Sequence, residues 1–135
     1  MSDRPREWTT WILLLLGAGS IANGGFMLLA PAPWFETIAA YTGPYNVHLV
    51  QDVGAAYVTA GAAAIWAGRR PAWRTPLATS AALFIGIHGA IHVVEVLRGL
   101  HPASHLVEDF PGVYLPALLL GWIAFRSRPT HAPKE

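Results

Sequence analysis

The 135-residue chain is 53% hydrophobic and only 13% charged, a balance that is unusual for a soluble domain of this size. Its formal net charge is +1, and its 9 Lys and Arg residues lie in short clusters, which argues against a nucleic-acid partner. The absence of Cys excludes disulfides, thiolate metal sites and cysteine nucleophiles. Any metal would therefore need nitrogen and oxygen ligands.

The first apolar segment is long enough to cross a lipid bilayer. No ionisable residue occurs between Trp8 and Phe35, and roughly 20 apolar residues suffice for a transmembrane helix. We interpret this segment as a retained helix and not as a cleaved signal peptide. The apolar run exceeds a typical signal-peptide core, and Asp3 and Glu7 dilute the positive charge before it.

Three more apolar segments follow, separated by connections that contain Pro or Gly. Four spanning helices are predicted in a single domain that comprises residues 1–135, at about 9–30, 47–68, 75–97 and 108–126. The remaining residues, 127–135, are predicted to form a disordered tail. The sequence thus predicts an all-α integral membrane protein.

Two of the predicted elements contain features that disturb a simple helix. The first connection is predicted to lie in the membrane interface and to be partly helical between Trp34 and Ala40. The fourth helix is short for a span and has Pro111 and Pro116 in its first half. We expect it either to begin earlier, near His105, or to be kinked.

The distribution of Lys and Arg predicts the orientation. Two precede the first helix, none lies in the first connection, three lie in "RRPAWR", one lies in the third connection and three follow the fourth helix. By the positive-inside rule, both termini and "RRPAWR" face the cytoplasm. Aromatic residues that suit a membrane interface fall near the same predicted ends, namely Trp8, Trp11, Trp66, Trp73 and Trp122. The predicted architecture is an antiparallel four-helix bundle.

Small residues predict where the helices approach one another most closely. In the first helix they are Gly17, Gly19 and Gly24, in the second they fill Gly54 to Gly68, and in the third they are Gly86, Gly89 and Ala90. Small side chains let helix backbones come together where lipid offers no hydrophobic driving force. The second helix is therefore predicted to lie at the centre of the bundle.

Five polar residues in the apolar runs form the candidate site. His88 and His92 are four residues apart and Glu95 follows three later, so they share one face of the third helix. His48 and Asp52 share a face at the start of the second helix. At 1.5 Å of rise per residue, Asp52 and His92 each lie roughly 9 Å below the same membrane surface. The two sets are predicted to meet near the periplasmic face.

Such groups cost about 2.5 to 3.5 kcal/mol each in the hydrocarbon layer, so they persist where they are paired or functional. One explanation is a metal site, in which up to three imidazoles and one or two carboxylates bind Zn, Fe, Cu or Mn. A second, equally favoured explanation is a hydrogen-bond network in which Asp52 accepts from His88 or His92 and no ion is present. Haem, with an axial His from each helix, is a weaker alternative, because Asp52 and Glu95 would then lie beside the macrocycle without a role.

Other polar residues could support the site. Asn23 and Gln51 could orient the ligands through hydrogen bonds, although a lone amide in a membrane helix more often links two helices. The third connection carries a polar patch made of His101, His105, Glu108 and Asp109. We interpret this patch as a solvated loop, with the delivery of ions to the site as the alternative.

From Thr42 to Gly61, "TGPYNVHLVQDVGAAYVTAG", and again at "HGAIHVVE", the chain resembles small four-span proteins of the bacterial inner membrane that are loosely DoxX-like. The resemblance implies a compact four-helix bundle in the cytoplasmic membrane and supplies no catalytic residue. The leading hypothesis is a metal-binding membrane protein with the lipid bilayer as its surroundings. The alternatives are a structural or accessory subunit of a membrane complex, and a redox enzyme that acts on a lipid or quinone. The sequence does not decide between a homo-oligomer and a larger complex.

Overall fold

The computed structural model describes residues 4–127, and all regular structure in that range is helical, which confirms the all-α prediction. The predicted disordered tail, 127–135, lies outside the described residues apart from Ser127. The α-helices are α1 (Arg4–Leu29), α2 (Pro31–Trp34), α3 (Val47–Arg69), α4 (Arg74–Leu97), α5 (Ser104–Glu108) and α6 (Leu115–Arg126). Short helical turns join them: η1 (Phe35–Ala39), η2 (Ala40–Thr42), η3 (Pro71–Trp73) and η4 (Phe110–Tyr114).

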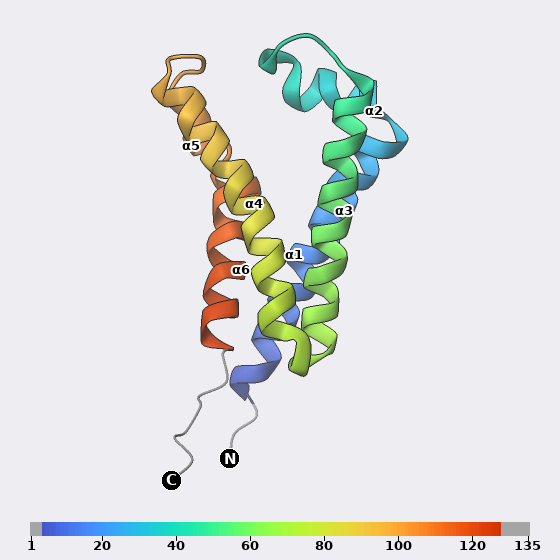
Figure 1. Ribbon diagram of the computed structural model, residues 1–135, viewed down its shortest axis with the longest axis vertical. Helices are drawn as coiled ribbons and strands as arrows, with labels where there is room; N and C mark the ends of the chain where they lie inside the picture. The colour runs from blue at the N-terminus through green and yellow to red at the C-terminus, as the bar shows by residue number, and fades with distance from the viewer. Residues whose placement is uncertain (1–3, 128–135) are drawn as a thin grey trace.

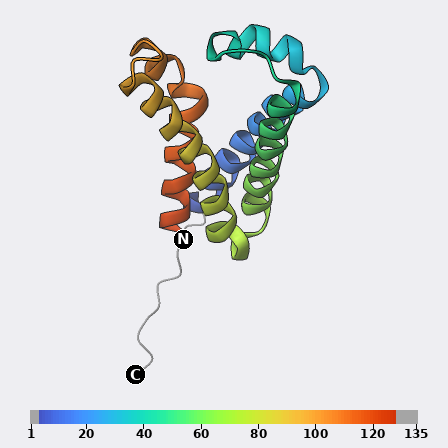
Figure 2. The ribbon, with the colours of Figure 1, turned by 45° about the horizontal axis from the view of Figure 1, so that its top comes forward.

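The four long helices form two pairs that meet at one end and diverge toward the other (Figure 1). α1 packs along α3, α4 packs along α6, and α3 also contacts α4 near the short η3 connection. The start of α1 and the end of α6 lie at the joined end, whereas α2 and α5 lie at the diverging end (Figure 2). At the diverging end, residues of both pairs line a groove.

Glycines bring α1 and α3 into backbone contact, as their sequence pattern predicts. A Cβ atom built on Gly17 would lie 2.7 Å from the Gly61 carbonyl oxygen, and one built on Gly24 would lie 2.5 Å from the Gly54 carbonyl oxygen. By contrast, a Cβ atom on Gly19 would meet nothing within 4 Å. The two contacts are seven residues apart on each helix, so they recur on one face and fix an antiparallel register.

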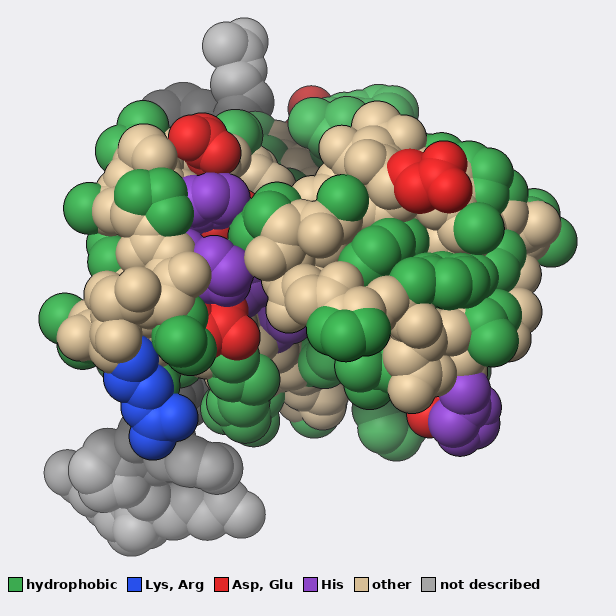
Figure 3. Space-filling model, turned by 90° about the horizontal axis from the view of Figure 1, so that it is seen from above, with side chains coloured by type: hydrophobic (Ala, Val, Ile, Leu, Met, Phe, Trp, Pro, Cys, Tyr) green, Lys and Arg blue, Asp and Glu red, His purple; other side chains and the backbone are tan. Residues whose placement is uncertain are grey.

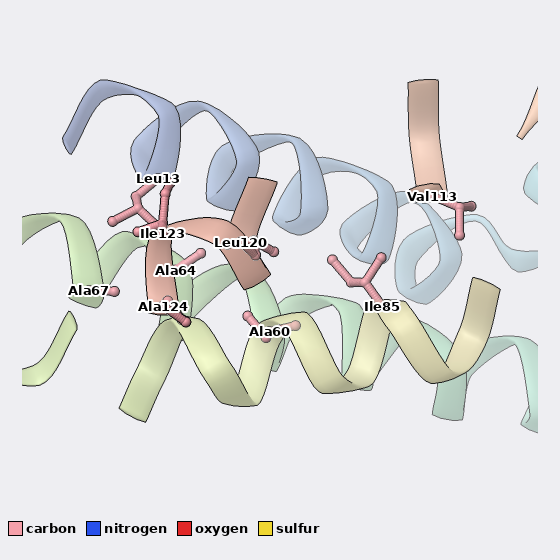
Figure 4. Packing of buried hydrophobic residues seen from close by; sticks show 11 residues of the cluster. Leu13, Ala60, Ala64, Ala67, Ile85, Val113, Leu120, Ile123 and Ala124 are labelled. Atoms are coloured by element: carbon pink, nitrogen blue, oxygen red, sulfur yellow. The ribbon is translucent and has the colours of Figure 1, made fainter. Parts of the chain in front are cut away.

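The main core lies where the two pairs join and takes residues from all four long helices (Figure 4). Leu13, Ile85, Leu120 and Ile123 are at most 1% exposed and fill the spaces between buried alanines. Because alanine side chains are short, the larger residues of the neighbouring helices can interdigitate with them. This main core holds the joined end together. A second, smaller cluster packs between α1 and α3 nearer the diverging end and consists of Met27, Val50 and Tyr57.

A buried arginine links three helices at the joined end. Arg74 is 6% exposed; its Nε donates to the Ala67 carbonyl oxygen at 3.3 Å and its Nη2 donates to Thr10 Oγ1 at 3.1 Å. A buried guanidinium needs such acceptors, because an unpaired charge in a low-dielectric interior is strongly unfavourable. The sequence predicts only that Arg74 marks the cytoplasmic side, whereas the structure shows that it also takes part in the packing.

The two segments predicted to depart from simple helices, the first connection and the start of the fourth helix, do so in the structure. Helical turns continue from α2 through η1 and η2, which confirms the helical segment predicted between Trp34 and Ala40. The fourth predicted helix begins earlier than 108, since α5 starts at Ser104 and the Asp109 amide donates to the His105 carbonyl oxygen at 2.8 Å. A wider turn, η4, then contains Pro111 and leads into α6.

Two helical stretches of the described chain are long and apolar enough to cross a membrane, Glu7–Leu29 and Pro71–Leu97, and Phe110–Arg126 is apolar but shorter. α3 has 23 residues but begins with several polar side chains. Many large apolar side chains point outward and stay exposed, among them Leu15, Leu29, Leu97, Leu118 and Phe125. Such extensive apolar exposure indicates a surface that contacts lipid or another protein.

Candidate functional site

α4 carries two histidines that are hydrogen-bonded to each other, and one of them, His92, is also hydrogen-bonded to Asp109, which directly follows α5. His92 Nδ1 lies 2.6 Å from Asp109 Oδ2, and His92 Nε2 lies 3.2 Å from His88 Nε2. A carboxylate only accepts, so His92 donates through Nδ1, and when the His92 ring is neutral its Nε2 accepts from His88. The three side chains therefore form one hydrogen-bonded chain, from Asp109 through His92 to His88.

Most of this chain is shielded from the surroundings. The side chains of His92 and Asp109 are 21% and 17% exposed. Hydrogen bonds to an ionised carboxylate are shorter and stronger than neutral ones, in agreement with the 2.6 Å separation. Asp109 therefore fixes both the orientation and the protonated nitrogen of the His92 ring.

A second layer of polar residues lies above the chain, at the α5 end. His101 Nε2 lies 3.9 Å from Glu95 Oε2, and His105 Nδ1 lies 3.9 Å from Glu108 Oε2. The Tyr41 ring, which comes from the first connection, packs at 4.4 Å from the His105 ring and edge-on at 5.1 Å from the His101 ring. Tyr41 thus bridges the two halves of the molecule across the diverging end.

The phenol of Tyr41 responds electrostatically to the acids below it. Burial raises its pKa above the ordinary value, and the negative charges of Asp109, Glu95 and Glu108 raise it further. The neutral hydroxyl is therefore the form that the folded protein favours.

Both layers line one cavity of about 180 Å³. Its ionisable and phenolic lining consists of His88, His92, His101, His105, Glu95, Asp109 and Tyr41. Figure 3 looks onto the diverging end and shows histidine and acidic side chains together in the hollow between the helices. Four imidazoles and two carboxylates therefore surround a space that is large enough for several water molecules.

The structure brings together only part of the predicted ligand set. His88, His92 and Glu95 line the cavity, but His48 and Asp52 do not. His48 Nε2 lies 3.3 Å from Asp52 Oδ2, and the two side chains are 84% and 63% exposed. The prediction that His48 and Asp52 meet His88, His92 and Glu95 is therefore wrong. The acid that hydrogen-bonds to His92 is Asp109.

The error comes from the rotation of α3 about its axis. The predicted depths place residues along a helix but do not say which way they face. Val50, Gly54 and Tyr57 are buried and form the inward face of α3. A residue two positions from Val50 lies about 200° further around the helix, so His48 and Asp52 point away from the site.

The two predicted supporting amides link helices instead of touching the histidines. Asn23 Oδ1 accepts from Trp34 Nε1 at 2.9 Å, and Gln51 Nε2 donates to the Leu28 carbonyl oxygen at 3.3 Å. The first bond joins α2 to α1, and the second joins α3 to the end of α1. This agrees with the linking role that sequence analysis gave as the alternative.

The third connection contributes more to the site than its sequence predicts. His101, His105 and Asp109 are 16%, 18% and 17% exposed and Glu108 is 63% exposed, so three of the four residues of the patch predicted to be a solvated loop are largely enclosed. The signal was present in the spacing, since His105 and Asp109 are four residues apart and the helix was expected to begin near His105. A helix that begins near His105 places Asp109 beside α4, whereas a loop at this position leaves the place of Asp109 open.

Fewer side chains could bind one metal ion together than the number of potential ligands that line the cavity. Within residues 4–127, no three His, Asp or Glu side chains are arranged so that they could hold a metal ion between them. The Nε2 atoms of His88 and His92 lie 3.2 Å apart, whereas the closer pair, His92 Nδ1 and Asp109 Oδ2 at 2.6 Å, is joined by a hydrogen bond. An ion at the two Nε2 atoms would have two protein nitrogens as ligands, and its other ligands would come from the cavity.

No protein-family model, no curated protein and no solved structure matches the chain. The similarity to the DoxX-like group stays a prediction.

Proposed function

We propose that this chain is a multi-pass protein of the bacterial cytoplasmic membrane that binds a transition metal ion reversibly at His88 and His92. The observation that carries the proposal is the convergence of the two Nε2 atoms, 3.2 Å apart, while Asp109 holds the far nitrogen of His92. A carboxylate behind a ligating histidine is a recurrent feature of metal sites, because it orients the ring and raises its basicity.

The separation of the two nitrogens suits ligation of one ion. Zinc binds imidazole nitrogen at about 2.0 to 2.1 Å, and two ligands at a tetrahedral angle are then about 3.3 Å apart. Binding requires the proton that His88 donates to His92 to move from Nε2 to Nδ1 of His88, so that both Nε2 atoms carry a lone pair for the ion. Imidazole ligands favour Zn, Cu and Fe over Mg and Ca, which narrows the class of ion.

The small number of protein ligands supports reversible binding. Structural zinc sites are closed by four protein ligands, whereas sites that exchange or activate a ligand leave positions open. Here the open positions would face the cavity of about 180 Å³. We therefore propose an exchangeable or reactive metal centre and not a structural one.

The membrane part of the proposal rests on the exterior. α1 and α4 have the length and apolar composition of spans, and the outward faces of the bundle carry large apolar side chains. At the joined end, the Trp8 and Trp122 rings lie 5.1 Å apart and the Arg126 guanidinium lies 5.7 Å from the Trp122 ring. Tryptophan and arginine together are typical of a cytoplasmic interface, so we place both termini there and the cavity near the periplasmic face.

A second candidate function uses the same contacts without an ion. The Asp109, His92 and His88 chain is already hydrogen-bonded, and it ties α4 to the segment after α5. In that case the cluster only stabilises the bundle, and the protein is a structural or accessory subunit of a larger complex or a homo-oligomer.

Metal binding by the purified protein separates the two functions. We would titrate detergent-solubilised protein with Zn²⁺ and Co²⁺ and measure bound metal by mass spectrometry and Co²⁺ absorption. His88→Ala and His92→Ala should abolish high-affinity binding, and Asp109→Asn should weaken it about 10-fold to 100-fold. His48→Ala is the matched control, because that exposed histidine also lies one helical turn from an acid. It should leave metal binding unchanged.

The opposite pattern would refute the metal centre. If wild type binds no more metal than the His88→Ala/His92→Ala double variant, while circular dichroism shows that both are folded, the hydrogen-bond network is the correct explanation. Should the alanine variants fail to fold, His92→Gln, which keeps a polar side chain near Asp109, provides the same comparison.

A further inference from the structure

A second, larger space lies between the two helix pairs. It is a groove of about 860 Å³ whose lining is mainly apolar and comes from both halves of the molecule. Leu16, Met27 and Val53 contribute from α1 and α3, and Val113 contributes from the other half. This volume and this mixture of many apolar groups with few polar ones are typical of sites for small molecules.

One side chain in the groove has an unused hydrogen-bonding group. Tyr57 lines the groove and is only 7% exposed, yet no residue that the structure describes hydrogen-bonds to its hydroxyl. Its ring is held edge-on against Phe84, with centroids 5.2 Å apart, and edge-on against His88 at 5.7 Å. A buried tyrosine usually directs its hydroxyl to a partner, so this one calls for an acceptor from outside the chain.

The open side of this hydroxyl is the groove itself. Every fully buried side-chain nitrogen and oxygen in the described part of the chain has a hydrogen-bond partner. The unpartnered Tyr57 hydroxyl must therefore be accessible, and the groove is the space that Tyr57 lines. A ligand in the groove can reach it.

The charges around the groove restrict the ligand. Glu108 and Asp109 line it together with His88 and His92, and among the described residues no Lys or Arg does. Two carboxylates without a neighbouring fixed cation disfavour an anionic head group. A neutral oxygen acceptor meets the Tyr57 hydroxyl without that repulsion.

We infer that the groove binds an uncharged amphiphile, whose carbonyl oxygen accepts a hydrogen bond from Tyr57 and whose hydrocarbon chain lies along the apolar walls. The carbonyl can belong to an ester of a membrane lipid or to a free long-chain carbonyl compound. Both share the chemistry that the groove selects. This inference is independent of the metal ion and can be tested without one.

Photo-crosslinking provides the test, with a long-chain methyl ketone that carries a diazirine on its hydrocarbon chain. The full-length protein is labelled in detergent with a metal chelator present, and the labelled residues are mapped by mass spectrometry. We expect saturable labelling of groove residues. Tyr57→Phe should weaken it about 3-fold to 10-fold, the effect of losing one hydrogen bond to a buried group. Tyr45→Phe, which changes a tyrosine outside the groove lining, should not alter it.

A pair of glycine substitutions on α1 tests the groove without touching Tyr57. Gly19 lines the groove and Gly25 does not, and a Cβ atom on either would meet nothing within 4 Å. Gly19→Leu should therefore fill the groove and abolish saturable labelling without disturbing helix packing. Gly25→Leu is the matched control and should label as wild type does.

Competition identifies the ligand class. An unlabelled methyl ketone or long-chain methyl ester should displace the probe, and displacement by a diacyl phospholipid would identify membrane lipid as the source of the carbonyl. Equal displacement by hexadecylamine or by palmitate would overturn the inference, because the groove would then not select a neutral head group. Labelling that ignores Gly19→Leu would overturn it as well, since the probe would then lie elsewhere.

Discussion

The contact between α1 and α3 makes a sharp prediction about Gly61→Ala. A Cβ atom at Gly61 would lie 2.6 Å from the Gly17 carbonyl oxygen, 2.8 Å from Ile21 Cγ1 and 2.9 Å from the Ile21 amide nitrogen. Ordinary van der Waals contact begins near 3.4 Å, so the methyl group overlaps three atoms at once. Two of the three belong to the α1 backbone, which cannot move without the whole helix.

The expected loss of stability follows from two opposing terms. Overpacking a tight contact costs about 1 to 3 kcal/mol, and the upper part of that range applies where backbone is in the way. Alanine is the better helix former and recovers about 1 kcal/mol. We therefore expect Gly61→Ala to lower the free energy of unfolding by about 2 kcal/mol.

The measurement is reversible unfolding in mixed micelles, followed by circular dichroism as the fraction of denaturing detergent rises. Gly19→Ala is the control, because a Cβ atom there meets nothing within 4 Å and only the gain in helix propensity remains. Gly17→Ala strikes the same contact from α1, so the Gly17→Ala/Gly61→Ala double variant should lose less than the sum of the two single losses. If Gly61→Ala proves as stable as Gly19→Ala, the close approach of α1 and α3 is not present.

Three further predictions concern polar contacts and use the same unfolding assay. Arg74→Ala removes the donor to Thr10 Oγ1 from a buried position and should cost about 1 to 3 kcal/mol; an unchanged midpoint would contradict the packing role of this arginine. Asn23→Ala should cost about 1 kcal/mol, because Trp34 Nε1 loses the acceptor that lies 2.9 Å away, and a glutamine variant that restores stability would support this reason. Because the pKa of Tyr41 is raised in the folded protein, folding holds the phenol proton and stability should fall as the pH rises above about 10. Tyr41→Phe should make the stability profile flatter in that range, and a variant that follows the wild-type profile would refute this assignment.

Much of the secondary structure was predictable because the features that specify it are local. Long apolar runs predicted the helices, and the polar breaks between them predicted the connections, since both depend only on neighbouring residues. The small residues also predicted close approach of the helices, and Gly17, Gly24, Gly54 and Gly61 do lie at a close contact, whereas Gly19 and Gly86 meet nothing within 4 Å. Such close approach of two helix backbones can be predicted from the sequence, because it requires glycine or another small residue at the contact.

The site was predicted less well because it depends on rotation and on long-range pairing. His88 and His92 were correctly placed on one face of a helix, and that face does line a polar cavity. Their acid partner was expected from α3 at Asp52, but Asp109 from the other half fills that position. Equal depth along two helices is a necessary condition for contact and not a sufficient one.

The sequence by itself determined that the protein is helical and apolar, and which turn of α4 concentrates imidazoles. These properties follow from composition and from the 3.6-residue period of a single helix. Only the tertiary structure decided that α3 turns His48 and Asp52 outward, that Asp109 completes the histidine chain, and that Tyr57 faces a groove. The physical reason is that packing at the joined end sets the rotation of every helix, and the polar groups at the diverging end take the partners that this rotation leaves within reach.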